Sequence, residues 1–282
     1  MLRYIYLYLL SPLHTGGTTQ EGNLLGIARE AHTNLPYIPS STIRGRLRAS
    51  IRDQIARVQL FGPDLKDLEN RKFVDEYQLA TQKQLTQLEQ GDIWVGDASI
   101  LWLPVPSLSH GVIWVSCPML LRRWVRFNAN ISTLPAEYSA NFATTGSAVY
   151  LKDAIVQPKD LQQWKDWKEF VPQTPETSAI ERVMVLPARH CATLIQISLW
   201  RQVKVKLDEH KSVEGGFRYE EAIPPDTLMY FPWGVTSQAN GTAAQSSTEF
   251  ERMLAANQIL QIGGQESLGR GFVQQWLSAI SK

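Results

Sequence analysis

The chain has 282 residues, of which 44% are hydrophobic and 20% are charged, so its composition is that of a globular protein and not a disordered one. Its formal net charge is +1, which excludes a strongly basic chain and requires any basic surface for nucleic acid to be local. Cys117 and Cys191 form neither a disulfide framework nor a CxxC metal motif, which favours a reduced, cytoplasmic location without a structural metal.

The N-terminal segment predicts a strand followed by a long loop. Residues 2–10 are apolar and β-prone on both faces, as in a central strand that is covered on both sides. This run is shorter than the ~18 residues that a membrane span needs. Residues 11–37 are rich in Gly, Thr, Asn and Pro and predict a loop of a length that is usually functional or disordered.

The next segment predicts one helix, capped by Ser40 or Ser41 and ended by Gly62-Pro63. Apolar residues recur every fourth position and make a buried stripe, with a basic ridge at the same spacing beside it. The stripe consists of Ile43, Leu47, Ile51 and Ile55, and the ridge of Arg44, Arg48 and Arg52.

The middle of the chain predicts strands and a second helix between polar segments. Residues 64–92 are charged and predict an exposed insertion. Residues 93–103 and 111–117 predict strands, with Pro104 and Pro106 between them, and Pro118 begins a helix. Residues 129–182 have little pattern, although Trp164, Trp167 and Phe170 favour an amphipathic cover helix over a stacking platform.

The C-terminal third predicts a hairpin over 183–207, with basic residues at 201–218. Residues 237–248 predict an exposed loop, followed by a helix at 248–257, a strand at 259–262, a glycine-rich loop at 263–271 and a last strand. This element order suits an α+β, ferredoxin-like sheet. We therefore expect a single domain over 1–282, with insertions near 64–92, 129–182 and 201–218.

Four segments, in order along the chain, carry a family resemblance. The first is Leu13-His14-Thr15-Gly16-Gly17 with Arg29 and residues 35–48, PYIPSSTIRGRLR in its core; the others are residues 97–118, 218–228 and 263–271. Together they resemble the RAMP superfamily, and the second and third resemble the repeated backbone subunit of Cmr-type (type III-B) CRISPR effector complexes. Four matches in register are far more specific than one glycine loop.

This resemblance implies a subunit that binds the guide CRISPR RNA and stacks in several copies along it. Its implied partners are the complementary target RNA, further copies of itself, a large polymerase-like subunit, a small helical subunit and capping RAMP subunits. A thumb hairpin would press between bases at regular intervals, and the lysines at 201–218, Lys204, Lys206 and Lys211, are its candidates. The implied RNA-binding residues are His14, Gly16, Arg29, Ser40, Ser41, Arg44, Arg48, Gly263, Gly264, Gly269, Arg270 and Gly271.

The chemistry of these motifs agrees with binding of an RNA backbone. A helix start with Ser40, Ser41 and free N–H groups is an anion site, and Arg44 and Arg48 add contacts to phosphate. Glycines in the 263–271 loop allow the backbone to approach a ligand closely. Such contacts hold a single strand with little reading of its sequence.

The family's cleavage of target RNA depends on an Asp five residues before the position of Arg29, and Leu24 stands there in this chain. Leucine supplies no oxygen to a hard cation, so we expect weak or no cleavage, and Mg²⁺ or Mn²⁺ only if cleavage is retained. Glu21 is the rival acid. Four candidates for supporting catalytic roles are present: His14, Tyr219, Glu220 and Glu221. Ser40, in place of the family's glycine, is a second departure.

Two other functions stay open at this point. A guide-RNA processing nuclease of the same superfamily needs a catalytic histidine, for which His14 is a candidate. A small-molecule enzyme is favoured less, because the sequence contains no HExxH, GxSxG or P-loop motif. The adjacent His190 and Cys191 are more typical of packing than of a catalytic dyad, whose members usually meet only in space.

Overall fold

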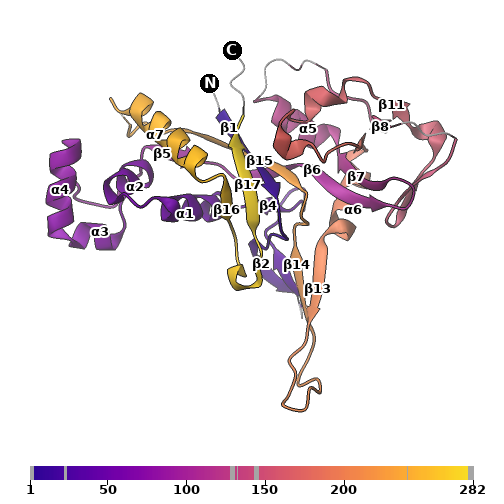
Figure 1. Cartoon of the computed structure of the whole chain (residues 1–282), viewed down its shortest axis with the longest axis horizontal. Helices are drawn as coiled ribbons and strands as arrows, with labels where there is room; N and C mark the ends of the chain where they lie inside the picture. Colours follow the sequence, from indigo (N-terminus) through magenta and orange to yellow (C-terminus); the bar gives the residue numbers. More distant parts are fainter. Residues whose placement is uncertain are drawn as a thin grey trace.

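The computed structural model describes residues 3–21, 24–127, 131, 133–142, 146–239 and 241–278. The fold is α+β, with one large sheet and one small sheet (Figure 1). The main path of the large sheet runs β11-β8-β12-β7-β6-β15-β1-β17-β16. These strands are β11 (Gln162–Gln163), β8 (Ser139–Ala140), β12 (Val183–Val185), β7 (Gly111–Ser116), β6 (Ala98–Ser107), β15 (Leu228–Val235), β1 (Arg3–Leu9), β17 (Phe272–Leu277) and β16 (Ile259–Gln261).

Strand β1 lies inside the large sheet, between β15 and β17 and antiparallel to both. Alternate residues point to opposite faces of a strand. Ile5, Leu7 and Leu9 therefore belong to one buried cluster, and Tyr4, Tyr6 and Tyr8 to another. The prediction of a central strand covered on both faces is confirmed.

The predicted long helix is two helices, α1 (Ser40–Ser50) and α2 (Gln54–Phe61). The chain becomes extended at Ile51, and Asp53 caps α2 by accepting hydrogen bonds from the N–H groups of Ile55 and Ala56. Pro39, and not a serine, is the N-cap of α1. A new cap in the middle of a continuous apolar pattern starts a second helix, which periodicity alone does not reveal.

The charged insertion after α2 is helical. It contains α3 (Leu65–Glu69) and α4 (Arg71–Thr81), which lie at one end of the molecule (Figure 1). Phe73, Tyr77 and Leu85 form a small apolar cluster of their own with Val58 of α2. Much of the insertion is exposed, as predicted, but it is anchored by this cluster.

Residues 11–37 are not the predicted long loop, because they contain three strands: β2 (Gly16–Glu21), β3 (Leu24–Ile27) and β4 (Tyr37–Ile38). Strand β4 pairs with β6 of the large sheet. Strands β2 and β3 join β13 (Trp200–Lys204) and β14 (Arg218–Ala222) in the small sheet, ordered β13-β14-β3-β2. Strand β3 pairs with its sequence neighbour β2 on one side and on the other with β14, almost 200 residues away, and local composition did not indicate this second partner.

The prediction of a hairpin over 183–207 is wrong, because α6 (Ala188–Ser198) separates β12 from β13. Its buried residues Cys191, Leu194, Ile195 and Ser198 have helical spacing, which the alternation on either side had hidden. Helix α7 (Ala243–Ala256) begins earlier than predicted, inside the expected exposed loop, because Ser246 and Phe250 are buried on the same face. Strands β16 and β17 agree with the prediction.

The middle of the chain forms the other end of the molecule (Figure 1). Pro104 and Pro106 lie within β6, beyond Trp102 where its pairing with β15 stops, so they disrupt no ladder on that side. Strand β5 (Ile93–Val95) pairs with β15, β9 (Val149–Leu151) pairs with β10 (Ala154–Val156), and α5 (Pro118–Val125) begins at Pro118 as predicted.

The predicted aromatic cover helix is not an α-helix. Trp164 follows β11, and Asp166–Phe170 is a 3₁₀ helix. Trp164 and Phe170 are nevertheless buried against Trp102, so the covering role is confirmed although the helix is not. Among the described residues, no helix is both long and apolar enough to cross a membrane.

Candidate nucleic-acid interface

The predicted thumb is a hairpin that extends away from the rest of the molecule (Figure 1). Strands β13 and β14 pair from Trp200–Ala222 to Lys204–Arg218, and a bridge between Leu207 and Val213 continues the pairing. Its exposed surface is partly apolar, with Val203, Val205, Leu207, Val213 and Phe217 all about half accessible. The hairpin near 201–218 is confirmed, whereas its contact with RNA stays a prediction.

The thumb lysines differ in their surroundings. The Lys204 ammonium lies 2.9 Å from a carboxylate oxygen of Glu220, and that of Lys206 lies 2.7 Å from Glu214. Lys211 lies in the turn at the tip, with a positive φ, and its N–H donates to the Asp208 carbonyl. Two of the three predicted RNA contacts are therefore already paired with carboxylates.

Two adjacent buried glutamates, Glu220 and Glu221, lie in β14 at the base of the thumb. Because neighbouring residues in a strand point to opposite faces, the two carboxylates serve different partners. Glu221 accepts a hydrogen bond of 2.7 Å from Arg29 and bonds of 2.9 to 3.0 Å from Arg201. Both oxygens of Glu221 are thus held by guanidinium groups, and its supporting catalytic role stays a prediction.

Glu220 faces the glycine-rich loop. The Arg270 guanidinium lies 3.1 Å from its carboxylate and stacks over the Trp200 ring at 4.5 Å. Burial would raise the pKa of Glu220, but the neighbouring Lys204 and Arg270 charges outweigh burial and lower it. Arg270 is only 4% exposed and is an internal ion-pair partner, so its contact with RNA stays a prediction.

His14 joins the glycine-rich loop to the thumb. Its buried ring places Nδ1 2.8 Å from the Glu221 carbonyl oxygen, so that nitrogen carries the proton and donates. The Gly264 N–H in turn donates to the His14 carbonyl at 2.9 Å. Because Nδ1 is held, Nε2 is the ring nitrogen left for any acid–base role.

The glycines of the 263–271 loop serve the chain's own packing. Gly263 and Gly271 have φ of +90° and +80°, where side chains are disfavoured. A Cβ at Gly271 would lie 1.9 Å from the Ile262 carbonyl oxygen, and one at Gly263 would lie 2.5 Å from that of His14. The predicted close approach is therefore to protein backbone at these two positions. Gly269, also at positive φ, faces open space.

Leu24 lies at the wall of a cavity of about 560 Å³ between β3, α6 and the thumb base. In register, Leu24 pairs with half-exposed Tyr219 of β14 and with Glu21 of β2. The side chain of the rival acid Glu21 lies outside the described part of the structure. The cavity is lined by Gly16, Leu24, Gly26, Ile27, Ala28, Arg29, Glu30, Ala31, Asn34, Tyr37, Pro39, Gln196, Arg201 and Glu221.

A second cavity, of about 510 Å³, lies along α1 and adjoins the first, since Pro39 lines one and Ser40 the other. Ser40, Ser41, Arg44 and Arg48 all line it, as a joint role in RNA binding requires. The Ser40 N–H, however, already donates to the Asp97 carboxylate at 2.6 Å. The anion site predicted at the start of α1 is thus filled in part by a side chain of the same molecule.

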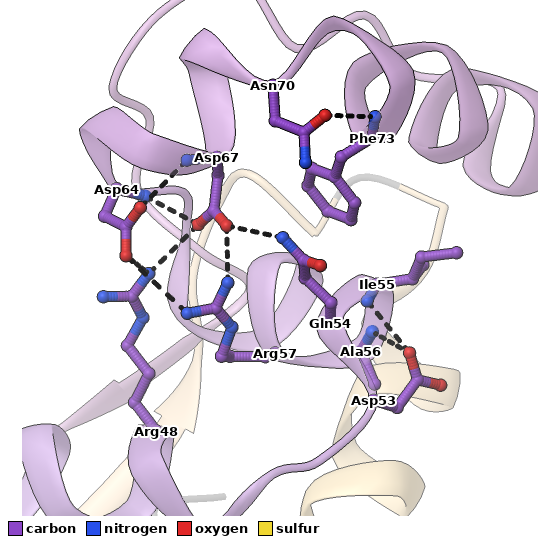
Figure 2. A network of polar contacts seen from close by, with 10 residues as sticks. All are labelled: Arg48, Asp53, Gln54, Ile55, Ala56, Arg57, Asp64, Asp67, Asn70 and Phe73. Atoms are coloured by element: carbon purple, nitrogen blue, oxygen red, sulfur yellow. Dashed lines mark hydrogen bonds and ion pairs between the residues drawn. The ribbon is translucent and has the colours of Figure 1, made fainter.

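The predicted basic ridge is largely engaged within the protein. Arg44 donates to the Phe61 carbonyl, and burial together with the charge of Arg48 lowers the pKa of its guanidinium. The Arg48 guanidinium lies 3.2 Å from the Asp64 carboxylate and 3.3 Å from that of Asp67, and the three side chains face one another (Figure 2). These two aspartates form a capping box at the start of α3. The three-residue spacing of these aspartates is a sequence signal for a helix start. It does not indicate which arginines the two carboxylates will contact.

Arg57 completes this ionic cluster. Its guanidinium contacts both Asp64 and Asp67, and the Gln54 amide donates to Asp67 at 2.9 Å (Figure 2). Asp67 is almost fully buried. The cluster fixes the α3–α4 insertion to α1 and α2, and it leaves less positive charge on this face than the sequence indicated.

The predicted site residues therefore fall into three connected groups. One group lies at one side of the thumb base and consists of His14, Glu220, Arg270 and the loop glycines. A second group lies at the other side and consists of Gly16, Leu24, Arg29 and Glu221. The α1 residues line the adjoining cavity. Sequence reasoning missed Arg201, Gln196 and Asn34 as partners of these groups, because nothing local to them signals the contact.

The histidine–cysteine pair does not form a dyad. The His190 ring contacts the Tyr138 hydroxyl at 2.9 Å, whereas Cys191 is fully buried. The hydrogen bond with Cys117 and burial both raise the pKa of the Cys191 thiol. The described residues also contain no group of three His, Cys, Asp or Glu side chains placed to hold a metal ion. This pair gives no support to an enzyme of small molecules.

Comparison with known proteins places the chain in a family. The model of the RAMP superfamily matches residues 6–274. The chain is 28% identical to the CRISPR system Cmr endoribonuclease Cmr4 of Pyrococcus furiosus, over 98% of this chain and 95% of that protein. A crystal structure of Cmr4 superposes with a TM-score of 0.70 at 25% identity, with all of both chains covered. A chain in the type III-B Cmr-beta structure bound to cognate target RNA shares the fold, with a TM-score of 0.71 at 16% identity over 98% of this chain and 97% of that one. The chain belongs to the RAMP superfamily.

Proposed function

We propose that this chain is a guide-RNA-binding backbone subunit of a type III RNA-guided effector complex, and that it holds the guide–target duplex without efficient cleavage. The observation that carries this proposal is the convergence of three family segments at the thumb base. Residue Leu13 pairs with Ile223, His14 pairs with Gly264, and the His14 ring reaches Glu221. Segments about 200 and 250 residues apart thus build one surface beside a projecting hairpin.

The partners follow from the relatives. Cmr4 is named as part of a CRISPR system, a crystal structure records an oligomeric Cmr4 from Pyrococcus furiosus, and the Cmr-beta assembly contains cognate target RNA. By analogy, this chain binds guide and target RNA, further copies of itself and the other subunits of a type III complex. The large polymerase-like, small helical and capping RAMP subunits are the expected neighbours.

The thumb and the adjoining cavities supply the RNA surface in this proposal. Val203, Val205 and Phe217 offer apolar contacts to bases, and Lys211 offers charge at the tip. Gly16, Arg29, Ser41 and Arg44 line the two cavities through which the RNA backbone would pass. Such a surface holds a strand mainly through phosphate and stacking, as a subunit that accepts any guide requires.

Loss of cleavage rests on the side chain at position 24. Leu24 faces the cavity where the family carries its acid, and it has no oxygen for a divalent cation. Glu221 does not replace it, because Arg29 and Arg201 occupy both of its oxygens. Mg²⁺ or Mn²⁺ would bind only if Glu21 had taken over the role. His14, with Nδ1 held, and half-exposed Tyr219, opposite Leu24, are the remaining candidates for proton transfer.

We also infer a ferredoxin-like core within the large sheet. Its strands in the order β6-β15-β1-β17 are all antiparallel, with α1 between β1 and β6 and α7 between β15 and β17 along the chain. This is the order of a βαββαβ unit. Residues 64–92, 129–182 and the thumb are then insertions into a single RAMP domain. The cytoplasmic location expected from the two cysteines stays a prediction.

The test uses the reconstituted complex with guide RNA, matched target RNA and Mg²⁺ or Mn²⁺. Wild type is compared with Leu24→Asp, with Leu24→Asn as an uncharged control of matched size, and with Glu21→Ala. We expect wild type and Leu24→Asn to bind target but leave it intact, and Leu24→Asp to cut it at regular spacing. Regularly spaced cutting by wild type would refute the inactive-subunit proposal, and its loss in Glu21→Ala would identify the acid.

A further inference from the structure

We infer that the cavity beside Leu24 is a binding site for one phosphodiester group of RNA, with Arg201 as its main ligand and Glu221 as the residue that positions Arg201. This inference rests on the proposed function, because it concerns the same RNA surface. It gives a role to a side chain at the root of the thumb and assigns to Glu221 a positioning role in place of an acid–base one.

The arrangement of charges supports this assignment. Glu221 is buried, and it holds Arg29 through one oxygen and Arg201 through the other. The side chain of Arg29 is 21% exposed, whereas that of Arg201 is 53% exposed. Arg29 is therefore the inner group, and Arg201 is the cation that reaches the open side of the cavity.

The hydrogen-bond geometry leaves Arg201 free to bind a ligand. Its Nε and Nη2 face Glu221, and among the described residues no acceptor contacts its Nη1. Arg29 is satisfied in contrast, since it also donates to the Asn34 carbonyl and to the Gln196 side chain. A guanidinium fixed along one edge by a carboxylate is pre-organised to offer its other edge to a phosphate.

The charge balance favours one monoanion. Arg29 and Arg201 carry two positive charges against the single charge of Glu221. Among the residues that the structure describes, the other charged group of the lining is Glu30, which lies 2.7 Å from Arg123 and is neutralised by it. The described side chains thus leave one positive charge in a partly enclosed cavity of about 560 Å³, where solvent screens it less than on an open surface. A phosphodiester carries one negative charge and fits this balance.

Leu24 favours phosphate binding at this site because it carries no negative charge. A carboxylate at that position would repel the phosphate and would compete for the Arg201 guanidinium. With leucine, position 24 supplies no negative charge to compensate the described arginines before RNA arrives, and its apolar side chain can contact a ribose or base. The same substitution that removes a metal ligand therefore strengthens an anion site.

The experiment is a double-mutant cycle between protein and RNA in the assembled complex. Single methylphosphonate linkages, which lack the phosphate charge, are placed one at a time along the target strand and, in a second series, along the guide. Binding is measured for wild type, for Arg201→Gln and for Arg252→Gln. Arg252 is a matched exposed arginine on α7, paired with Glu249, and serves as the control. Arg201→Gln leaves Glu221 paired with Arg29, so the fold keeps a balanced ion pair.

We expect wild type and Arg252→Gln to lose about tenfold in affinity at particular linkages, and Arg201→Gln to lose nothing further at those same linkages. The log–log salt slope of Arg201→Gln should fall by about one unit. Sensitive linkages in the target series or in the guide series assign the strand. A wild-type scan without a sensitive linkage, or additive effects at every linkage in both strands, would overturn the inference.

These outcomes are separable from failure of the proposed function. If the wild-type complex does not bind guide RNA at all, the proposed function fails. If it binds guide and target normally but Arg201→Gln couples to no linkage, the phosphodiester site alone fails. Glu221→Gln adds a check on the positioning role, since it should weaken binding at the same linkages that Arg201→Gln affects, whereas a purely structural role would weaken all linkages equally.

Discussion

Replacement of Glu220 by glutamine should destabilise the protein strongly, although the side chain keeps its size. Glu220→Gln removes the carboxylate charge and leaves Arg270, which is 4% exposed, without its counter-ion. Breaking a buried pair by removal of one partner costs about 3 to 5 kcal/mol. Lys204, at 36% exposure, can return to water, and Arg270 keeps Gln202 and the Trp200 ring. We therefore expect a loss near the lower end, about 3 kcal/mol.

The measurement is urea unfolding at pH 7, followed by circular dichroism, with the two midpoints compared at a common slope. The double variant Glu220→Gln/Arg270→Met removes the orphaned charge and should recover part of the loss, because the two residues are in contact. A decrease in the free energy of unfolding below about 1 kcal/mol for Glu220→Gln, the range of surface ion pairs, would refute the assignment of Glu220 as the buried counter-ion of Arg270. So would additivity of the two substitutions.

The pH dependence gives an independent check. The pKa of Glu220 is lowered in the folded protein from its ordinary value of 4.5, by the charges of Lys204 and Arg270 against the opposing effect of burial. The carboxylate then contributes stability that is fully present above the unfolded-state pKa and is lost as the pH falls through the folded-state pKa. The difference in stability between wild type and Glu220→Gln should therefore be constant near neutral pH and shrink below pH 4.5.

Two further predictions concern the insertion and the glycine-rich loop. Asp67→Ala removes the buried acceptor of Arg48, Arg57 and Gln54 and should lower the free energy of unfolding by about 3 kcal/mol. The loss should appear as faster amide exchange across residues 64–92. The exposed Asp75→Ala variant is the control, and equal exchange in the two variants would contradict the role of the cluster. Gly271→Ala places a Cβ 1.9 Å from the Ile262 carbonyl oxygen at a φ of +80° and should abolish stable folding. Gly45→Ala, with open space around its Cβ, should be neutral or slightly stabilising in thermal melts; a Gly271→Ala variant that melts like wild type would rule out the predicted clash.

Local patterns identified many of the elements because their causes are local. Two-sided hydrophobicity marked β1, the proline at position 118 marked the start of α5, and the four-residue spacing of Ile43 and Leu47 marked α1. The same local reasoning failed where a pattern was ambiguous. Alternating residues around 188–198 look like a hairpin but form α6, and a mid-pattern cap at Asp53 splits one expected helix into two.

Sequence alone determined the family, through contiguous motifs that survive as strings of residues, and it predicts that Leu24 stands where the family carries its acid. Only the tertiary structure decided which of the motif residues are free to meet RNA. Arg48 and Arg270 form ion pairs with carboxylates of the same chain. Arg29 and Glu221 are in contact although they are 192 positions apart in the sequence. Ion pairs of this kind depend on the relative placement of strands far apart in the chain, and a charge in a sequence does not reveal whether its partner will be water, protein or phosphate.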